Sequence, residues 1–540
     1  MACAAAGAAR ARQAATRGGS APAASTSRRC LPARRPAARR GGARCSAAEQ
    51  AALQAHQALP ALAAASAAAL AASVGGFAWE RDNCEPPPEA APQGAATRPE
   101  AGRAFTLGLV PIFLATPFFA RATYRSEAVP GRLWSFEQKQ GIGLGLNTSL
   151  NVRMTVGRLA SGNLFVYGPV APTGECRALI EELLAQREGS KVELIVLGTS
   201  LLEHKQFLAP FARAYPAARV LVSPGQWSWP LNLPLRLLGV ARAEEVRDGD
   251  ASQLPAELQS RTLDLPPVGL LPWIRFTEVA LYHAPTRSLM VTDAAMRLPD
   301  APPPTVSERD LLEWADDRNT AISGLRLLRL FGVEEAARRY GLKRAGEREP
   351  AAARALGWRR MALTALFFGQ RDVLRPEATW AELTARPLLV PPVVGVLVYG
   401  DVAAEKGVLT DTVAQWSAEV AKWPFRRVLP AHFAIADAGP REWSAAFAQW
   451  QRKSSSTVAS AARDGVAASP LQRLAGAIQA ALPASSPLGR VSDRQAGRKG
   501  TKEYYPAQDV QCLKDVRGAL ISLGIVFTEA TRPERPLPRK

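Results

Sequence analysis

The stretch Val192–Phe207 reads VELIVLGTSLLEHKQF, and it determines the class of fold that we expect. Its apolar run, Leu194–Leu197, predicts a buried strand at Val192–Leu197, and a helical pattern follows from about Glu203 to Tyr215. A second apolar run occurs in ARVLVSP, residues 218–224. Strand, helix and strand at this spacing predict an α/β fold whose sheet is at least partly parallel.

The residues before this stretch add two strands and a helix. In RMTVGRLASGNLFVYGP, residues 153–169, apolar runs flank a turn at Ser161-Gly162-Asn163, which predicts two strands joined by that turn. Thr173 is placed to cap a helix whose apolar residues recur on one face. Further along, residues 306–342 and 351–383 combine a helical pattern with mixed charges, which predicts solvated outer helices.

The charge of the chain is concentrated at its ends. The 540 residues carry a formal net charge of +19 and are 47% apolar. Residues 1–50 hold ten arginines and one acid, and residues 485–540 carry eleven basic and six acidic side chains. The region between them has a net charge of only about +5, so we do not expect nucleic-acid binding. The six cysteines show no CxxC spacing, which argues against a disulfide framework or a zinc finger.

The N-terminal region has the composition of a targeting segment. It is rich in Ala, Arg and Ser and has no acid before Glu49. We predict that residues 1–48 are a plastid transit peptide and that the protein lies in the chloroplast stroma; a disordered basic arm is the other interpretation. The apolar run ALPALAAASAAALAASVGGFA leaves association with the thylakoid as an alternative location.

The two flanks of the folded body are expected to be irregular. Residues 49–130 have the composition of a low-complexity linker with one apolar segment, Leu107–Phe119. Prolines interrupt this segment, and it is shorter than the ~20 residues that a bilayer-spanning helix needs. We therefore expect no transmembrane helix in the folded body, residues 131–452, and a buried segment or a peripheral membrane contact at Leu107–Phe119. Residues 453–540 predict a basic, mostly flexible tail with a short ordered segment near 508–528.

Carboxylates and imidazoles follow three of the predicted strands. Glu203 and His204 follow the strand that ends at Leu197, Asp293 follows RSLMVT, and His432 follows RRVLPA. Strand ends of this kind meet at one edge of a parallel sheet, where ligands bind. Because both groups are transition-metal ligands, the pattern is compatible with a metal site. Composition and spacing alone favour an ordinary acid in the first turn of a helix and two ordinary histidines.

Several phrases resemble one known family in the same order along the chain. They are LWSFEQ, RMTV, YGPVAPTGEC, LLEHKQFLAPFARAYPAARV, SPGQWSWPLNLPL, VTDA and WPFRRVLPAHF. Together they resemble the domain of unknown function 4336, a family of plastid and cyanobacterial proteins, over about residues 131–450. That family resembles a degenerate metallo-β-lactamase fold, which implies an αββα sandwich with its site at strand ends, between disordered N-terminal and C-terminal extensions.

The resemblance also implies that the ligands of one metal are lost. The superfamily pattern H-x-H-x-D-H falls on residues 199–204, so Thr199 and Leu201 replace two first-metal histidines. Residues 273–277 occupy the place of the third first-metal histidine, and His283 lies too far along its strand to replace it.

The ligands implied for the second metal are present in kind. They are Glu203, His204, Asp293 and His432. We expect either no cofactor or one Zn, Fe or Mn ion at these residues. Trp227 and Trp229 are candidates for the floor of a substrate pocket, with ordinary packing as the alternative.

Two functions follow from this implied site. Since superfamily hydrolysis usually uses two ions, the loss of one favours a non-catalytic binding or assembly protein of the plastid, whose partner the sequence does not identify. The alternative is a mononuclear metal-dependent hydrolase of an ester, thioester or phosphoester.

Overall fold

The computed structural model of the chain describes residues 95–105, 115–117, 119–142, 148–228, 232–240, 242–267, 274–319, 338–367, 373–400, 408–451, 504–506 and 509–522. The predicted transit peptide, residues 1–48, lies outside this part of the chain, as do residues 49–94 of the predicted linker. Residues 107–114 and 118 of the apolar segment Leu107–Phe119 and most of the predicted tail also lie outside it.

The first sheet is built around β6 (Val192–Leu197), whose bounds are those predicted from the sequence. Its strands in spatial order are β1 (Ala115–Thr116), β3 (Leu133–Ile142), β4 (Thr148–Arg158), β5 (Leu164–Tyr167), β6, β7 (Arg219–Val222) and β8 (Ala243–Glu245), and β2 (Tyr124–Val129) also pairs with β3. β4 and β5 are antiparallel on either side of the predicted turn, whereas β5 to β8 are parallel. The C-terminal ends of the parallel strands therefore share one edge of the sheet.

The second sheet brings distant parts of the chain to the same edge. Its strands are β9 (Leu258–Asp264), β10 (Thr277–His283), β11 (Ser288–Val291) and β12 (Arg427–Pro430), in the order β12-β11-β10-β9. β11 and β12 are parallel, so their C-terminal ends lie side by side. β10 runs antiparallel to β11, which places the start of β10 at that edge as well. Backbone hydrogen bonds join this edge to the first sheet, because Val279 N donates to Gly198 O and Ser200 N donates to Thr277 O.

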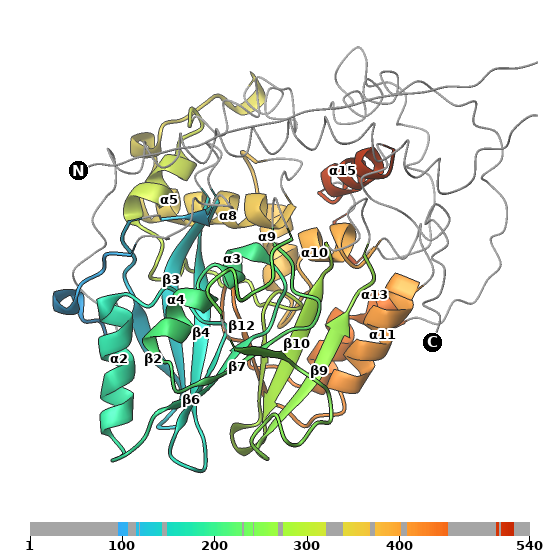
Figure 1. Ribbon diagram of the computed structural model, residues 1–540. Coiled ribbons are helices and arrows are strands. Elements are labelled where there is room, and N and C mark those ends of the chain that lie inside the picture. Colours follow the sequence, from blue (N-terminus) through green and yellow to red (C-terminus); the bar gives the residue numbers. More distant parts are fainter. Residues whose placement is uncertain are drawn as a thin grey trace, which may run out of the picture.

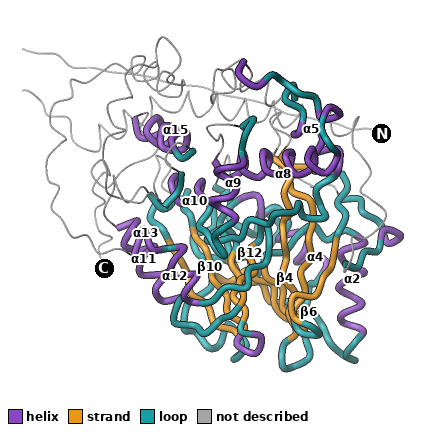
Figure 2. Tube along the Cα trace, turned by 180° about the vertical axis from the view of Figure 1, so that it is seen from behind, coloured by secondary structure: helices purple, strands orange, loops and turns teal. Residues whose placement is uncertain are grey.

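The two sheets pack face to face over a shared apolar core. Phe165 and Val196 of the first sheet and Leu281, Met290 and Leu429 of the second are at most 1% exposed. The outer face of the first sheet is covered by α2 (Gly174–Ala185) and α4 (Leu208–Ala214) (Figure 1). The outer face of the second sheet is covered by α11 (Val408–Val420), α12 (Pro440–Ala446) and α13 (Ala448–Gln451), as Figure 2 shows from behind. The α/β class and the αββα layer order are thus those expected.

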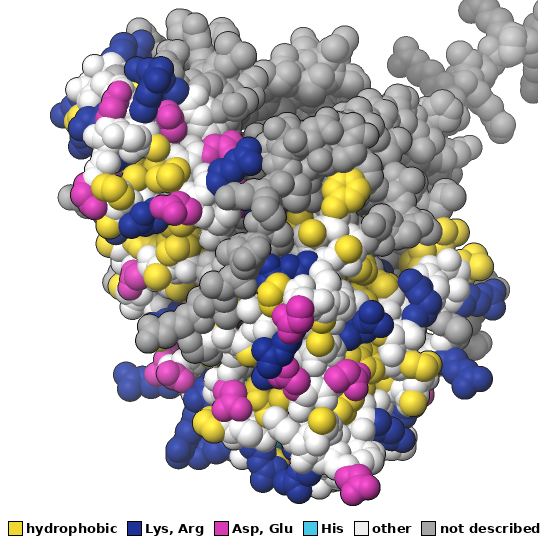
Figure 3. Space-filling model, turned by 90° about the vertical axis from the view of Figure 1, so that its left-hand side faces the viewer, with side chains coloured by type: hydrophobic (Ala, Val, Ile, Leu, Met, Phe, Trp, Pro, Cys, Tyr) yellow, Lys and Arg dark blue, Asp and Glu magenta, His cyan; other side chains and the backbone are white. Residues whose placement is uncertain are grey.

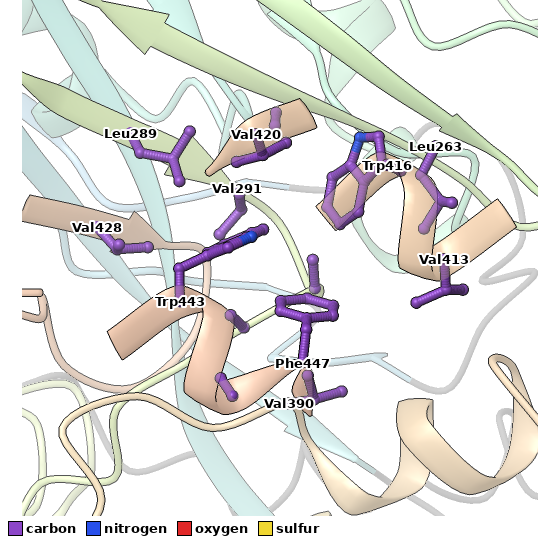
Figure 4. Packing of buried hydrophobic residues seen from close by; sticks show 14 of the residues in the cluster. Leu263, Leu289, Val291, Val390, Val413, Trp416, Val420, Val428, Trp443 and Phe447 are labelled. Carbon is purple, nitrogen blue, oxygen red and sulfur yellow. The ribbon is translucent and has the colours of Figure 1, made fainter. Parts of the chain in front are cut away.

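Aromatic side chains fill the layer between the second sheet and its helices. Trp443 of α12 lies against Leu289, Val291 and Val428 of the sheet, and Trp416 of α11 lies beside Leu263 (Figure 4). On the opposite side, Thr173 accepts a hydrogen bond from Cys176 N and caps α2 as the sequence predicts.

The remaining helical elements are η1 (Pro99–Ala101), α3 (Leu202–Lys205), η2 (Ala284–Thr286), α5 (Glu308–Ala315), η3 (Ala345–Glu347), α8 (Pro350–Phe367), α9 (Glu377–Thr384), α10 (Pro392–Leu397) and α15 (Gln511–Ser522). α5, α8 and α9 lie above one end of the sandwich, and both views agree on this (Figures 1 and 2). Their shared core contains Trp314, Trp358 and, from α15, Leu513. α15 falls within the ordered segment predicted near residues 508–528.

Two helical predictions differ from the structure. The helix expected from Glu203 to Tyr215 is two helices, α3 and α4, because Pro210 in the first turn of α4 prevents a continuous helix through Gln206. The prediction that residues 351–383 form a solvated outer helix is also wrong for α8, because Trp358 and Arg360 of this helix are fully buried.

The folded body begins before residue 131. β2 pairs with β3 over most of its length, although the composition of residues 49–130 predicts a linker. The fully buried carboxylate of Glu175 attaches this region to α2, because it accepts hydrogen bonds from Arg98 N at 2.9 Å and Thr123 N at 2.7 Å. The composition of residues 49–130 could not predict this attachment, because the acceptor, Glu175, lies far from them in the sequence.

The surface carries both signs of charge. On the face shown in Figure 3, basic and acidic side chains are interspersed with apolar ones. Among the described residues, no helix has the length and apolar character that crossing a membrane requires.

Candidate metal centre

Three of the four predicted site residues meet at the shared edge of the two sheets. His204 lies on α3, directly after β6 and the loop at residues 198–201. Asp293 follows the end of β11 by two residues, and His432 follows the end of β12 by two residues. Their candidate ligand atoms all lie within 4.8 Å of one another, although the three residues come from distant parts of the sequence.

Asp293 lies between the two imidazoles. Its Oδ2 is 3.5 Å from His204 Nε2, and its Oδ1 is 3.5 Å from His432 Nε2. The centroids of the two imidazole rings are 5.1 Å apart. The side chains of His204, Asp293 and His432 are 2%, 9% and 11% exposed, so the group is buried but not sealed.

The ring of His432 is oriented by a backbone carbonyl. Its Nδ1 lies 2.8 Å from Asn151 O, and because a carbonyl oxygen only accepts, Nδ1 carries the proton. In the neutral ring the Nε2 lone pair therefore faces the Asp293 carboxylate. Asn151 and Arg153 of β4 hold this loop further, since Phe433 N donates to Asn151 Oδ1 and Arg153 donates to Pro430 O. Arg153 also donates to Phe433 O at 2.5 Å.

The two histidines differ in their affinity for a proton. Burial lowers the pKa of His204, but the carboxylate of Asp293, with help from Glu203 and Glu278, outweighs burial and leaves the pKa raised. Burial dominates at His432, and the charge of His204 adds to it, so the pKa of His432 is lowered. In the metal-free protein, a proton therefore binds His204 before His432.

Glu203 is near this group but is not a member of it. Among the described residues, the ligand atoms that converge belong to His204, Asp293 and His432, whereas Glu203 was expected as a fourth ligand. Its side chain is half-buried at the start of α3. Burial raises the pKa of Glu203, and the charge of Asp293 adds to the increase.

Glu278 is the site residue that sequence reasoning missed. It is fully buried in β10, beside Asp293, and its carboxylate accepts backbone hydrogen bonds from Thr292, Asp293 and Ala294. Burial raises the pKa of Glu278 to about 8, and the charge of Asp293 contributes to this shift. The available signal was an acid inside the apolar run FTEVALYH, residues 276–283.

The positions implied for a first metal hold no ligands. Thr199 is buried, and its hydroxyl accepts a hydrogen bond from Leu201 N. Leu201 is partly buried and packs against the core between the second sheet and its covering helices. His283 lies at the far end of β10 from Thr277, where its Nδ1 contacts the hydroxyl of Thr286 at 2.8 Å.

Of the two tryptophans proposed for a pocket, the structure describes only Trp227. Trp227 is 9% exposed, and its indole N–H donates to Arg275 O at 2.8 Å. The ammonium of Lys205 lies 5.2 Å from the centre of its ring and donates to Trp227 O. Burial lowers the pKa of Lys205 to about 7. Trp227 is thus buried and held by contacts with Arg275 and Lys205, and Trp229 lies outside the described residues.

The three converging residues fit a single metal ion. Two ligand atoms that are each ~2.1 Å from a tetrahedral ion lie ~3.4 Å apart, close to the observed 3.5 Å separations. A direct N–H···O hydrogen bond would bring the same atoms to ~2.7–3.2 Å. His204 Nε2 and Asp293 Oδ2 are also buried without a hydrogen-bond partner among the described residues. Two imidazoles and a carboxylate are ligands for Zn, Fe or Mn.

The layer order and the position of the site agree with what the sequence resemblance implied. An αββα sandwich with a histidine and carboxylate group at the edge where strands of both sheets end is the arrangement expected from the resemblance to a metallo-β-lactamase fold. Residues 130–382 match the family model described as domain of unknown function (DUF4336). The match includes His204 and Asp293 but ends before His432, whereas the resemblance seen in the sequence extends to about residue 450. No curated protein matches the sequence.

Solved structures similar to this chain include flavodiiron proteins and metallo-β-lactamases. A diflavin flavoprotein fragment from Nostoc sp. PCC 7120 shares 10% identity, with 62% of this chain and 96% of that chain covered and a TM-score of 0.31. A metal-soaked flavodiiron core from Synechocystis sp. PCC6803 shares 12% identity, with 62% of this chain and 61% of that chain covered and a TM-score of 0.31. A metallo-β-lactamase from Pontibacter korlensis shares 9% identity, with 61% of this chain and 100% of that chain covered and a TM-score of 0.29.

Proposed function

We propose that the domain binds one divalent transition-metal ion through His204, Asp293 and His432 and hydrolyses an ester, thioester or phosphoester. One observation carries the metal proposal. The backbone carbonyl of Asn151 fixes the proton of His432 on Nδ1, so the Nε2 lone pair faces a carboxylate oxygen at 3.5 Å. Two electron-rich atoms in that arrangement repel unless a cation lies between them. A proton on His432 Nε2 is not expected to be that cation at neutral pH, because burial lowers the pKa of His432.

The three ligands and Glu203 have separate tasks in this proposal. His204, Asp293 and His432 hold the ion, which when bound supplies a Lewis acid that lowers the pKa of water to near neutrality. Glu203 is half-buried next to His204, with a pKa raised by burial, and a carboxylate oxygen of this kind takes up the proton of an attacking water. Among the described residues, Glu203 is an acid at this edge that is neither a ligand nor bonded to the loop after β11.

A second candidate is supported by the first-metal positions. Thr199 is buried and Leu201 is partly buried against the core, and neither side chain offers the imidazole expected for a second ion. If hydrolysis requires two ions, the same single-ion site would serve to bind or assemble a partner without catalysis.

The first prediction concerns metal content and ligand identity. Elemental analysis of the full-length protein should find one equivalent of Zn, Fe or Mn per chain. H204A and H432A should each lose it, because two remaining protein ligands hold an ion weakly. H283Q is the matched control, since this buried histidine lies away from the group, and it should retain the metal.

The outcomes separate the candidates. A metal-free parent, or a parent whose metal survives both replacements, contradicts the metal proposal. The loaded parent is then assayed with a p-nitrophenyl ester, a thioester and a phosphodiester, beside E203Q. Hydrolysis that falls ~10²–10⁴-fold in E203Q while metal content is unchanged supports the hydrolase. A loaded parent that is inactive on all three favours the binding or assembly role.

A further inference from the structure

Glu278 is the acidic side chain of a fully buried strand. All seven residues of β10 are buried, and Glu278 is 0% exposed. Its Oε1 accepts from Thr292 N at 2.7 Å and Ala294 N at 3.1 Å, and its Oε2 accepts from Asp293 N at 3.2 Å. We propose that Glu278 is a positioning residue that fixes the backbone of Asp293 and thereby sets the affinity of the group for its metal. This inference rests on the metal site proposed above.

The contacts of Glu278 hold three consecutive residues. Thr292, Asp293 and Ala294 are 1%, 7% and 0% exposed, so their N–H groups need acceptors inside the protein. A carboxylate can satisfy all three, because it has two oxygens with four lone pairs and no donor. The hydroxyl of Thr292 adds a further contact, at 3.1 Å from the hydroxyl of Tyr167. The backbone on both sides of the Asp293 side chain is therefore restrained.

The choice of an acid at this position has a cost that the metal would offset. Glu278 and Asp293 are two buried acids in direct contact, since Glu278 Oε2 lies 3.2 Å from the backbone nitrogen of Asp293. Like charges at short range in a buried setting repel strongly. A neutral side chain would avoid this repulsion, but a glutamine has only one acceptor oxygen and would present its NH2 group to an N–H donor. A divalent cation held by Asp293 compensates the repulsion and makes the carboxylate favourable at position 278.

The test measures metal affinity rather than activity. Zn²⁺ is titrated into the metal-free full-length protein against a chelating dye, for the parent and for E278Q. The substitution should weaken Zn²⁺ binding ~10–100-fold, the range typical of a partner that orients a metal ligand. The visible absorption spectrum of bound Co²⁺ should also change, because the position of one ligand changes.

E175Q is the matched control. Glu175 is also fully buried and also accepts two backbone N–H groups, but it lies on α2, away from the site. E175Q should lose stability and keep the Zn²⁺ affinity and Co²⁺ spectrum of the parent. Equal losses of affinity in E175Q and E278Q would reduce Glu278 to a general contributor to stability.

Other outcomes overturn the inference on separate grounds. A parent that binds no metal defeats the proposed function itself. A parent that binds Zn²⁺ while E278Q binds it equally well defeats only the role of Glu278. If E278Q does not fold, E278D, which keeps the charge and shortens the side chain, is titrated instead and should also bind more weakly. Amide hydrogen exchange at residues 292–294 of the parent provides a reading without any substitution, and rapid exchange there would contradict the role of Glu278.

Discussion

Asp293 is the residue on which the site depends, because each of its carboxylate oxygens faces a different imidazole. Burial alone would raise its pKa, but His204 and His432 outweigh burial and the pKa is lowered. The carboxylate therefore stays ionised at neutral pH, which is the form that binds a metal ion. Its position is fixed by Glu278, and that of His432 by Asn151. Each proposed metal ligand on the second sheet thus has a partner that orients it.

His283 provides a pH prediction that is independent of the metal. Burial and Arg132 lower its pKa to about 4, against an ordinary value of 6.5. The unfolded chain therefore binds a proton at His283 that the folded chain does not bind between these two pH values. Stability should fall as the pH falls from about 6.5 to 4, by at most about 1.4 kcal/mol per pH unit from this group. Denaturant titrations of the parent and of H283Q at several pH values measure the difference.

The result that contradicts this prediction is specific. If H283Q loses stability over this pH range as steeply as the parent, the acid sensitivity comes from other groups. Above pH 6.5 the two proteins should show no difference in pH dependence.

Individual site residues could be predicted where they follow strands. His204, Asp293 and His432 each follow an apolar run, and the rule that ligands collect at strand ends identifies all three. Glu278 could not be found by that rule, because it lies within β10 and acts through the backbone of a different strand. Only the register between β10 and β11 reveals the contact, and register depends on contacts across the sheet.

At the scale of elements, α8 shows how an ion pair can allow a charged helix to be buried. Arg360 is fully buried on α8, and it lies 2.7 Å from the carboxylate of Asp317. The same carboxylate lies 2.6 Å from Arg348 and accepts a hydrogen bond from Lys343 N. Burial lowers the pKa of Arg360, whereas Asp317 opposes that shift. The residues that follow α5 therefore neutralise the buried cation of α8.

Replacement of Asp317 should lower the free energy of unfolding. D317A leaves Arg360 buried without its counter-charge, and we expect a loss of ~3–5 kcal/mol in the free energy of unfolding. E308A is the matched control, because the Arg354–Glu308 pair also joins α5 to α8 but is exposed. It should change stability by less than ~1 kcal/mol. Denaturant unfolding measures both, and similar losses in the two variants would contradict the ion-pair explanation.

The predictability of an element depends on how local its cause is. β6 was predicted to the residue because its apolar residues lie next to one another in the sequence and are followed at once by Gly198. β2 was not, because its place in the sheet depends on pairing with β3 and on the distant carboxylate of Glu175. The mixed charges of α8 predicted exposure, since the pairing of Arg360 with Asp317 is a tertiary contact.

At the scale of the whole molecule, the proposed ion would connect the two sheets. His204 follows a strand of the first sheet, whereas Asp293 and His432 follow strands of the second. The αββα class and this convergence follow from the sequence resemblance, and the plastid transit peptide proposed for residues 1–48 stays a prediction. The helices above the sandwich were not anticipated in their buried form, because their core is shared among α5, α8 and α15.

A bound ion should stabilise the entire domain. An ion present at 100 times its dissociation constant adds ~2.7 kcal/mol to the free energy of unfolding, because it binds only the folded chain. We expect the melting temperature of the parent to rise with added Zn²⁺ and to fall with a chelator. H204A should melt at one temperature under both conditions. A parent that is insensitive to both additions would contradict a metal link between the sheets.

The contacts between β4 and the loop after β12 also set the order of events during synthesis. Asn151 and His432 are 281 residues apart, and Arg153 and Phe433 are 280 apart. A ribosome that adds ~5–20 residues per second needs ~14–56 s to pass from the first of these residues to the last. During that time the inner face of the first sheet has no second sheet complete enough to cover it. The three residues of the proposed metal site can come together only after the segment that follows β12 has left the ribosome.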